Sequence, residues 1–199
     1  MYPENLIHLG DLRLTIGLAG AVTVWLFGAY SSRSAAFWCI AAGSALGIVA
    51  ASKIMYLGWG VQSAALDFKA ASGHAVGAAA VLPVALYLLA MSFGRRQQTI
   101  GLLAGSVTSI AVAVSLVIHG EHTVSEALTG WCVGSVASGV TWLHLRHKVM
   151  RPSPQVIGAA VAVGLIAATC MQAVPAGWWM IKTALALSGE RTVHSWDEC

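Results

Sequence analysis

The sequence predicts an all-α protein, a polytopic membrane helical bundle, and three observations carry this prediction. Only 10% of the 199 residues are charged, with 11 Lys and Arg and 8 Asp and Glu, whereas a soluble domain carries about 25%. Hydrophobic residues make up 57% of the chain, and its mean hydropathy is +0.74. Apolar runs long enough to cross a bilayer recur along the chain. This pattern excludes a cytosolic enzyme, a secreted disulfide scaffold and a nucleic-acid binder.

Six apolar stretches have the length of membrane-spanning helices, which need about 20 residues each. They cover residues 13–31, 35–52, 73–93, 99–118, 124–143 and 156–175. A further run, 178–187, begins with two Trp residues, which predicts an interfacial anchor on a helix extension or a short surface helix. The connection 53–72 is too long for a tight turn and too polar for a span. We therefore expect about six transmembrane helices in a single integral membrane domain, 1–199.

Charged residues divide between the two faces of such a bundle. The loops on one face, 32–34, 94–98 and 144–155, carry six Lys or Arg residues and no acidic residue. The other face holds both termini and the two remaining loops, and all eight acidic residues lie on it or at the adjoining helix ends. The first face carries six Lys and Arg residues and the other face carries five, so the positive-inside rule favours the first face as the cytoplasmic one only narrowly. We predict a plasma (inner) membrane protein with this basic face in the cytoplasm and both termini outside.

A histidine and a glutamate lie at the start of the fifth predicted span. His122 and Glu126 are four residues apart, so a helix places them on one face. A carboxylate there can accept a hydrogen bond from one ring nitrogen, which fixes the tautomer and leaves the other nitrogen as a nucleophile or base. The alternative interpretation is a helix-capping carboxylate beside an interfacial histidine.

A second cluster precedes the third predicted span. Ser72, Gly73 and His74 stand where a serine hydroxyl and backbone amides at a helix N-terminus form an anion site. Gly73 allows a close backbone approach, and His74 can protonate a leaving oxygen. Lys53, at the end of the preceding span, can clamp a phosphate. The alternatives are an N-cap serine beside an interfacial histidine, and a lysine that reaches to the membrane surface.

The order and spacing of these residues resemble the three motifs of the type 2 phosphatidic acid phosphatase superfamily of membrane lipid phosphatases. That family has a Lys followed after six residues by Arg-Pro; then Pro-Ser-Gly-His; then Ser-Arg, five residues, His, three residues and Asp. The corresponding segments here are Lys53 to Gly60-Val61, Ala71-Ser72-Gly73-His74, and Ser115-Leu116 to His122 and Glu126. The resemblance covers about 53–135, within a phosphatase-like core of about 53–145.

The resemblance implies a hydrolase of lipid metabolism that acts on a lipid phosphate or diphosphate and needs neither a metal nor an organic cofactor. His122 would be the nucleophile that becomes a phosphohistidine, and Glu126 would orient it and stabilise its charge. His74 would protonate the leaving group. The resemblance assigns the phosphate oxygens to three residues: Lys53, Ser72 and Gly73. The implied partners are the lipid phosphate substrate and membrane lipids.

Both arginines of the family motifs are absent, because Gly60 and Leu116 stand in their places. Arginine binds phosphate in a bidentate manner that lysine does not reproduce. We expect Lys69 and His119 to supply positive charge instead. Two alternatives remain open: a lipid phosphotransferase that uses the same histidine, as in the related sphingolipid-synthase-like branch without these arginines, and a non-catalytic lipid-binding relative.

Three further groups have simpler interpretations. His119, Glu121 and His122 would need a fourth ligand in a fixed frame to bind a metal, so we expect no metal site there. His144 lies in a basic segment that anchors the cytoplasmic face and touches anionic lipid head groups. Trp131, near the proposed site, belongs to an aromatic belt or to helix packing, or else lines a lipid access route.

Overall fold

The computed structural model describes residues 4–148, 152–171 and 174–194, and over this part the chain is α-helical. Two short elements come first, α1 (Glu4–Ile7) and a 3₁₀ turn at His8–Gly10. Seven longer helices follow within the described residues: α2 (Leu12–Ala29), α3 (Ser32–Trp59), α4 (Gly73–Leu89), α5 (Arg95–Ile118), α6 (Val124–Leu145), α7 (Pro154–Cys170) and α8 (Ala176–Ser188). The predicted all-α class is confirmed.

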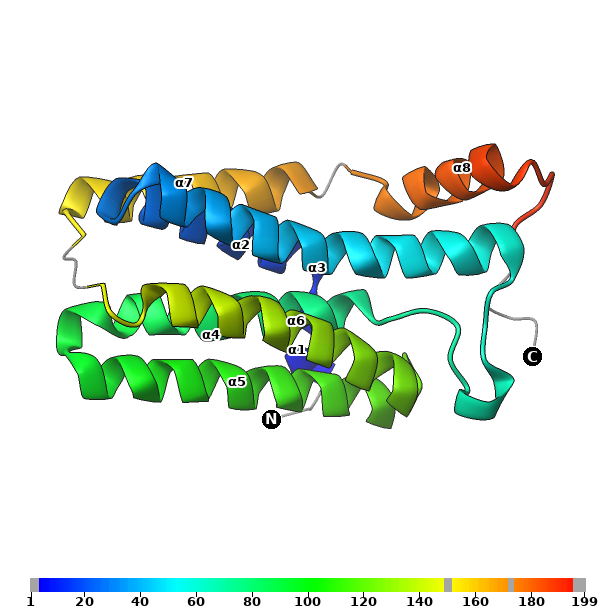
Figure 1. The fold of residues 1–199 in the computed structure, drawn as a ribbon, viewed down its shortest axis with the longest axis horizontal. Coiled ribbons are helices and arrows are strands. Elements are labelled where there is room, and N and C mark those ends of the chain that lie inside the picture. Colours follow the sequence, from blue (N-terminus) through cyan, green and yellow to red (C-terminus); the bar gives the residue numbers. More distant parts are fainter. Residues whose placement is uncertain (1–3, 149–151, 172–173, 195–199) are drawn as a thin grey trace.

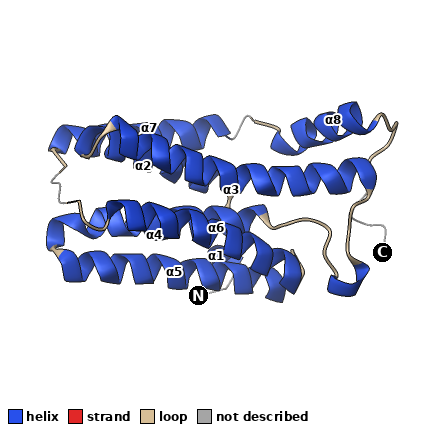
Figure 2. Ribbon diagram, in the orientation of Figure 1, coloured by secondary structure: helices blue, strands red, loops and turns tan. Residues whose placement is uncertain are grey.

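The long helices lie in two layers (Figure 1). One layer contains α2, α3, α7 and α8, and the other contains α4, α5 and α6. Helix α3 extends past the ends of its neighbours, and α8 packs along the projecting part. Figure 2 shows the connection between α3 and α4 as a loop that turns back from the tip of α3 toward the bundle. This loop therefore lies at the same end of the bundle as the starts of α4 and α6.

Helix α4 is the central helix of the bundle. It packs against α2, α3, α5 and α6, and 13 of its 17 residues are buried. Glycines on the neighbouring helices allow the close approach: a Cβ on Gly130 would lie 2.5 Å from the Ser72 carbonyl oxygen, and one on Gly105 would lie 2.5 Å from the Pro83 Cα. Small residues at such contacts are typical of helix packing in membranes. This packing fixes the first turn of α4, which carries His74.

Three helices, α2, α3 and α5, are long and apolar enough to cross a membrane, and α4 and α7 are shorter apolar helices. Large apolar side chains point outward from these elements; Phe27, Ile40 and Val107 are each more than 60% exposed. A soluble monomer rarely exposes so much contiguous apolar surface. The helices therefore indicate an integral membrane protein.

The predicted loop 53–72 is wrong in its first third, because α3 continues to Trp59 and ends at Gly60 in the left-handed conformation (φ 65°). Lys53 interrupts the hydropathy there without interrupting the helix. Helix α8 covers this part of α3, since a Cβ on Gly58 would lie 3.2 Å from the Ala184 carbonyl oxygen. Lys53 thus lies within a helix, about two turns before its end.

Other helix boundaries shift by a few residues. The run at 178–187 forms a separate helix, α8, as one of the two expected alternatives. Helix α7 ends at Cys170, short of the predicted 175. Helix α4 gives way after Leu89 to a 3₁₀ turn, Ala90–Phe93, that leads into α5.

Candidate active site

The expected contact between His122 and Glu126 is present. The His122 Nδ1 atom lies 2.8 Å from Glu126 Oε2, and the Glu126 side chain is buried. The second carboxylate oxygen, Oε1, accepts hydrogen bonds from the backbone amides of Lys69 at 3.0 Å and Ala70 at 3.3 Å. A carboxylate only accepts, so Nδ1 is the donor, and in the neutral ring the lone pair is on Nε2. The carboxylate therefore fixes the tautomer that a nucleophilic histidine requires.

A short turn between α5 and α6 places His122. Helix α5 ends at Ile118 with His119 as its C-cap, and Gly120 follows with φ 71°, a conformation that glycine adopts without strain. The amides of Glu121 and His122 then donate to the Leu116 carbonyl oxygen at 3.0 and 3.3 Å. Thr123 caps α6, and its hydroxyl accepts from the Glu126 amide. The connection between α5 and α6 thus holds the His122 backbone about one helical turn before Glu126 along the chain.

His74 reaches the same end of the bundle from the second residue of α4. The Ser72 amide donates to the Glu126 carbonyl oxygen at 3.1 Å, which ties the start of α4 to the first turn of α6. His74 and His122, which come from sequence-distant motifs, therefore lie at the same end of the bundle.

Lys53 enters this site from α3. Its Nζ atom lies 3.9 Å from the position that a Cβ on Gly73 would occupy. Gly73 is the first residue of α4, where the amide has no partner within its own helix. A cation and a helix N-terminal amide thus lie side by side, which is the arrangement that binds a phosphate oxygen.

Four consecutive amides secure the segment that carries these groups. Lys69 and Ala70 donate to Glu126 Oε1, Ala71 donates to the Ser52 hydroxyl at 3.2 Å, and Ser72 donates to the Glu126 carbonyl. Residues 69–72 are therefore attached to α3 on one side and to α6 on the other.

Three of the predicted phosphate-binding side chains have other contacts. Ser72 is fully buried, and its hydroxyl caps α4 by accepting from the Ala75 amide at 3.3 Å. The Lys69 Nζ atom lies 5.9 Å from the centre of the Tyr56 ring. His119 Nδ1 lies 2.7 Å from the Ser115 carbonyl oxygen of its own helix. Each of these three side chains therefore has a structural contact of its own, and their predicted role in phosphate binding stays a prediction.

The places of the two missing arginines are occupied in different ways. Leu116 is 1% exposed and packs with the buried apolar residues of α4 and α5. At Gly60 the space for a side chain is filled by the His194 ring, whose atoms lie 3.0–3.2 Å from the position of a Cβ. The His194 amide donates to the Leu57 carbonyl oxygen at 3.1 Å. Sequence reasoning missed this contact because nothing in the C-terminal segment marks it.

An apolar groove of about 390 Å³ runs between α5 and α6 and starts beside the histidine turn. Ile118 and Val124 line one end, and Leu128 and Trp131 continue it along α6. The Trp131 indole N–H donates to the Ser109 hydroxyl at 3.1 Å, which fixes the ring against α5. The groove therefore connects the lipid-facing surface with the turn that holds His122.

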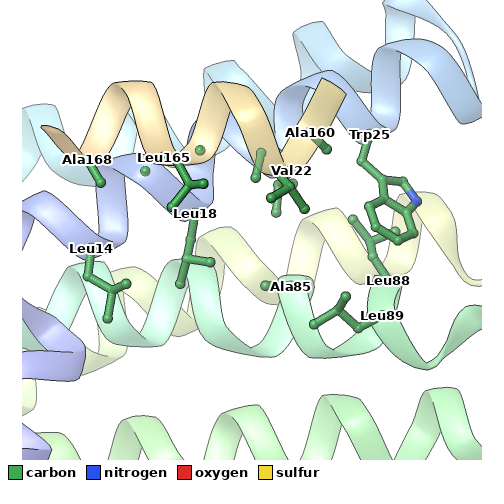
Figure 3. Close-up of a pocket in the computed structure, with 14 residues that line it drawn as sticks. Leu14, Leu18, Val22, Trp25, Ala85, Leu88, Leu89, Ala160, Leu165 and Ala168 are labelled. Atoms are coloured by element: carbon green, nitrogen blue, oxygen red, sulfur yellow. The ribbon is translucent and has the colours of Figure 1, made fainter. Parts of the chain in front are cut away.

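Figure 3 shows a second apolar pocket, of about 330 Å³, enclosed by α2, α4 and α7. Leu14, Trp25, Leu88 and Leu165 line it among other apolar residues, and its lining contains no ionisable side chain. This pocket can hold hydrocarbon but supplies no groups for catalysis. Within the described residues no group of three or more His, Cys, Asp or Glu side chains forms a candidate metal site.

Comparison with known proteins gives one informative match. A Klebsiella pneumoniae protein described as "Uncharacterized 22.5 kDa protein in cps region" is 32% identical to this chain over 145 residues. The match covers 72% of this chain and 68% of that protein. No family model matches the sequence, and no solved structure matches it.

Proposed function

The chain belongs to the family of the 22.5 kDa Klebsiella pneumoniae protein, and we propose that it is a membrane-embedded phosphatase that removes phosphate from a lipid phosphate or diphosphate. The observation that carries this proposal is the His122–Glu126 pair, bonded at 2.8 Å, with His74 at the same end of the bundle. The resemblance of the motifs at 53–126 to the type 2 phosphatidic acid phosphatase superfamily supports it. Lys53 and the Gly73 amide complete the set of groups that such a reaction uses.

We propose six membrane spans, α2 to α7, with both termini and the histidine site on the outer face of the plasma membrane. The distribution of charge supports this arrangement. The segments at the histidine end are the starts of α2 and α6, the turn before α6, and the loops after α3 and α8, and they contain the acidic residues with described side chains: Asp11, Asp67, Glu121, Glu126 and Glu190. The helix ends on the opposite side of the bundle, at the starts of α3 and α5 and the end of α6, contain or adjoin Arg33, Arg95, Arg96, Arg146 and Lys148. Basic residues are retained on the cytoplasmic side of membrane proteins.

The reaction has two steps. In the first, His122 Nε2 attacks phosphorus, and the bond to the lipid oxygen breaks as that oxygen takes a proton from His74. In the second, His74 takes a proton from water, the water oxygen attacks phosphorus, and the bond to Nε2 breaks to release phosphate. Glu126 accepts the Nδ1 hydrogen bond throughout and stabilises the charge of the phosphorylated ring. The Lys53 ammonium and the Gly73 amide stabilise the negative charge on the phosphoryl oxygens.

The groove between α5 and α6 supports a lipid substrate in particular. Its lining residues Ile118, Val124 and Leu128 are apolar and open to the membrane side. A hydrocarbon chain that enters along this groove brings its head group to the His122 turn. Ligand sites commonly combine an apolar wall with a few polar groups that fix the reacting end.

The proposal is tested with purified protein in detergent micelles that contain phosphatidic acid, phosphatidylglycerol phosphate, an isoprenoid diphosphate or a lipid A phosphate. We expect phosphate release from at least one of them, and acid-labile radioactive label on the protein when the donor phosphate is labelled. Folded protein that releases phosphate from none of these lipids would contradict the hydrolase proposal.

A second candidate function is a lipid phosphotransferase that passes the phosphoryl group from His122 to an acceptor alcohol. The observation that favours it is the loss of both arginine positions, since Leu116 is buried among apolar residues and Gly60 is covered by His194. A labelled donor lipid distinguishes the two functions. Label in a second lipid supports transfer, and label only in free phosphate rejects it.

A further inference from the structure

The apolar pocket of Figure 3, about 330 Å³ in volume, separates α7 from α4. Helix α7 packs mainly on α2, and the two helices meet closely, since a Cβ on Gly17 would lie 2.7 Å from the Gly164 carbonyl oxygen. Ala85 and Leu88 of α4 line the pocket on the side facing α7. All three helices are proposed membrane spans, so the surroundings of the pocket are hydrocarbon.

The dimensions of the pocket suit one hydrocarbon chain. It follows α2 from Leu14 to Trp25, a length of about 16 Å along the helix axis. An apolar cavity of about 150 Å³ binds benzene, so a pocket of about twice that volume takes about a dozen carbon atoms. Side chains at its rim, Leu89, Val161 and Leu165, are each more than half exposed. An acyl chain of a membrane lipid therefore fits the pocket and reaches it from the side.

Trp25 closes the pocket at the end where α2 and α4 finish (Figure 3). Its side chain is 8% exposed, and its indole N–H has no hydrogen-bond partner within the described residues. Figure 3 shows the nitrogen on the side of the ring away from Leu14 and Leu18. A buried donor without an acceptor is unfavourable. An acceptor oxygen on a ligand that extends past this end of the pocket would be stabilised there.

Cations follow directly after both helices that form this end of the pocket. Helix α2 ends at Ala29, and Arg33 is the second residue of α3; α4 ends at Leu89, and Arg95 is the first residue of α5. The connecting residues 30–31 and 90–94 contain no acidic side chain. Neither arginine has an ion-pair partner in the part of the chain that the structure describes. These charges are complementary to an anionic head group beyond the pocket.

We propose that this pocket binds an anionic phospholipid from the leaflet at the basic end of the bundle, the end that carries Arg33 and Arg95. One acyl chain fills the space between α4 and α7, an ester carbonyl lies at the depth of Trp25, and the phosphate lies at the two arginines. The pocket itself offers only apolar contacts, so the arginines select the head group.

This lipid is a structural ligand and not a substrate. The histidine site lies at the opposite end of the same bundle, so the inference goes beyond the proposed phosphatase function and does not depend on it. The acyl chain joins α7 to α4, which the protein alone holds apart at the pocket. A ligand that binds the folded state in this way stabilises it.

The test measures the melting temperature of the purified full-length protein in dodecyl maltoside micelles. Dioleoyl phosphatidylglycerol or dioleoyl phosphatidylcholine is added at equal concentration; the two lipids share their chains and differ in head-group charge. We expect phosphatidylglycerol to raise the melting temperature by about 5 °C or more above the value with phosphatidylcholine. Native mass spectrometry should show one phosphatidylglycerol molecule retained per chain.

Three alanine variants locate the bound chain. Ala85→Phe places a ring in the pocket, and Ala168→Phe narrows the end near Leu14 and decides the question should Ala85→Phe not fold. In each we expect the shift with phosphatidylglycerol to fall by more than half. Ala104→Phe adds the same ring at an exposed position of α5 that does not line the pocket. It should keep the wild-type shift.

Charge variants test the head group. The double variant Arg33→Gln and Arg95→Gln should respond to phosphatidylglycerol no more strongly than to phosphatidylcholine, because the attraction for the phosphate is removed. Lys182→Gln, which removes a cation from α8 instead, should keep the wild-type preference.

Each result supports or overturns a defined part of the inference. Equal shifts with the two lipids in the wild-type protein would overturn the choice of an anionic lipid. A wild-type shift in a folded pocket variant would overturn the location. Wild-type protein that responds to neither lipid would overturn the inference as a whole. Phosphate release is measured separately, so its absence would not affect this inference.

Discussion

Each end of the bundle holds a histidine in a short side-chain hydrogen bond, but the partners have opposite charges. At one end His122 Nδ1 lies 2.8 Å from the Glu126 carboxylate. At the other, His144 Nε2 lies 2.7 Å from the Lys148 Nζ atom and 3.3 Å from the Ser34 hydroxyl. An ammonium group only donates, so His144 Nε2 must accept and its ring is neutral. The two histidines therefore differ in which ring nitrogen is bonded and in whether that nitrogen donates or accepts.

The difference shows that the partner, not the histidine, decides the chemistry. The carboxylate leaves the second nitrogen of His122 with its lone pair and supports positive charge on the ring. At the other end the Lys148 bond uses the lone pair of His144, and Phe37 stacks on the ring with centroids 4.5 Å apart and an interplanar angle of 11°. His144 is held as part of a cationic anchor, consistent with contact to anionic lipid head groups.

The largest difference between the two ends is expected when each histidine is replaced by asparagine. We expect His122→Asn to lower the rate of phosphate release by about a thousandfold or more, because removal of a nucleophile removes the covalent route. We expect His144→Asn to stay within about twofold of wild type. The measurement is phosphate release together with acid-labile labelling of the protein. Similar losses in both variants would show that the two ends are not chemically distinct.

A smaller loss is expected when the carboxylate is neutralised and its shape is kept. Glu126→Gln retains an oxygen for the amides of Lys69 and Ala70 but no longer supports the charge on His122. We expect the rate of phosphate release to fall by about a hundredfold or more, as for other carboxylates that orient a catalytic histidine. Circular dichroism and melting temperature serve as the folding control. A rate unchanged from wild type would mean that Glu126 only caps the helix.

Two glycines of α6 test whether the histidine end is the more tightly packed one. A Cβ on Gly130 would lie 2.5 Å from the Ser72 carbonyl oxygen, whereas a Cβ on Gly139 would meet nothing within 4 Å. We expect Gly130→Ala to destabilise the protein by about 1–3 kcal/mol through overpacking. Gly139→Ala should be neutral or stabilising by up to about 1 kcal/mol. Thermal unfolding in detergent measures both, and equal melting temperatures would contradict the packing argument.

The smallest effect is expected from Lys148→Gln at the basic end. This change removes hydrogen bonds of 2.7 and 2.8 Å to His144 and Ser34. We expect a loss of about 1 kcal/mol or less in stability, because a hydrogen bond contributes little net free energy where water or other donors compete. Phosphate release should stay within about twofold of wild type. A large loss of activity would instead connect the basic end to catalysis.

Local features of the site could be predicted from the sequence. The spacing of His122 and Glu126 placed both on one helical face, because a helix repeats every 3.6 residues. The position of Ser72 before an apolar run predicts its N-cap role as one of two alternatives. The spans predicted at 73–93 and 99–118 separate His74 from His122, and two antiparallel spans return the chain to the same end of the bundle.

The features that depend on distant segments could not be predicted. The extension of α3 past Lys53 depends on α8, which covers it from the far end of the sequence. The filling of the Gly60 position by His194 and the approach of Gly10 to His74 are tertiary contacts between segments with no shared periodicity. Complete burial of Ser72 results from the packing of Gly130 onto its backbone.

Protection of the four amides of residues 69–72 from hydrogen exchange depends on the site being assembled. They lie in a connector, yet each donates to α3 or α6, and three of them donate to Glu126. In deuterium exchange this stretch should therefore remain protonated longer than the exposed residues 61 and 62 of the same connector, although neither stretch belongs to a long helix. Peptides that cover 69–72 would then lose protection together when the starts of α4 and α6 separate. The exchange rate of this short segment thus measures how long the two histidines stay assembled, without substrate or turnover.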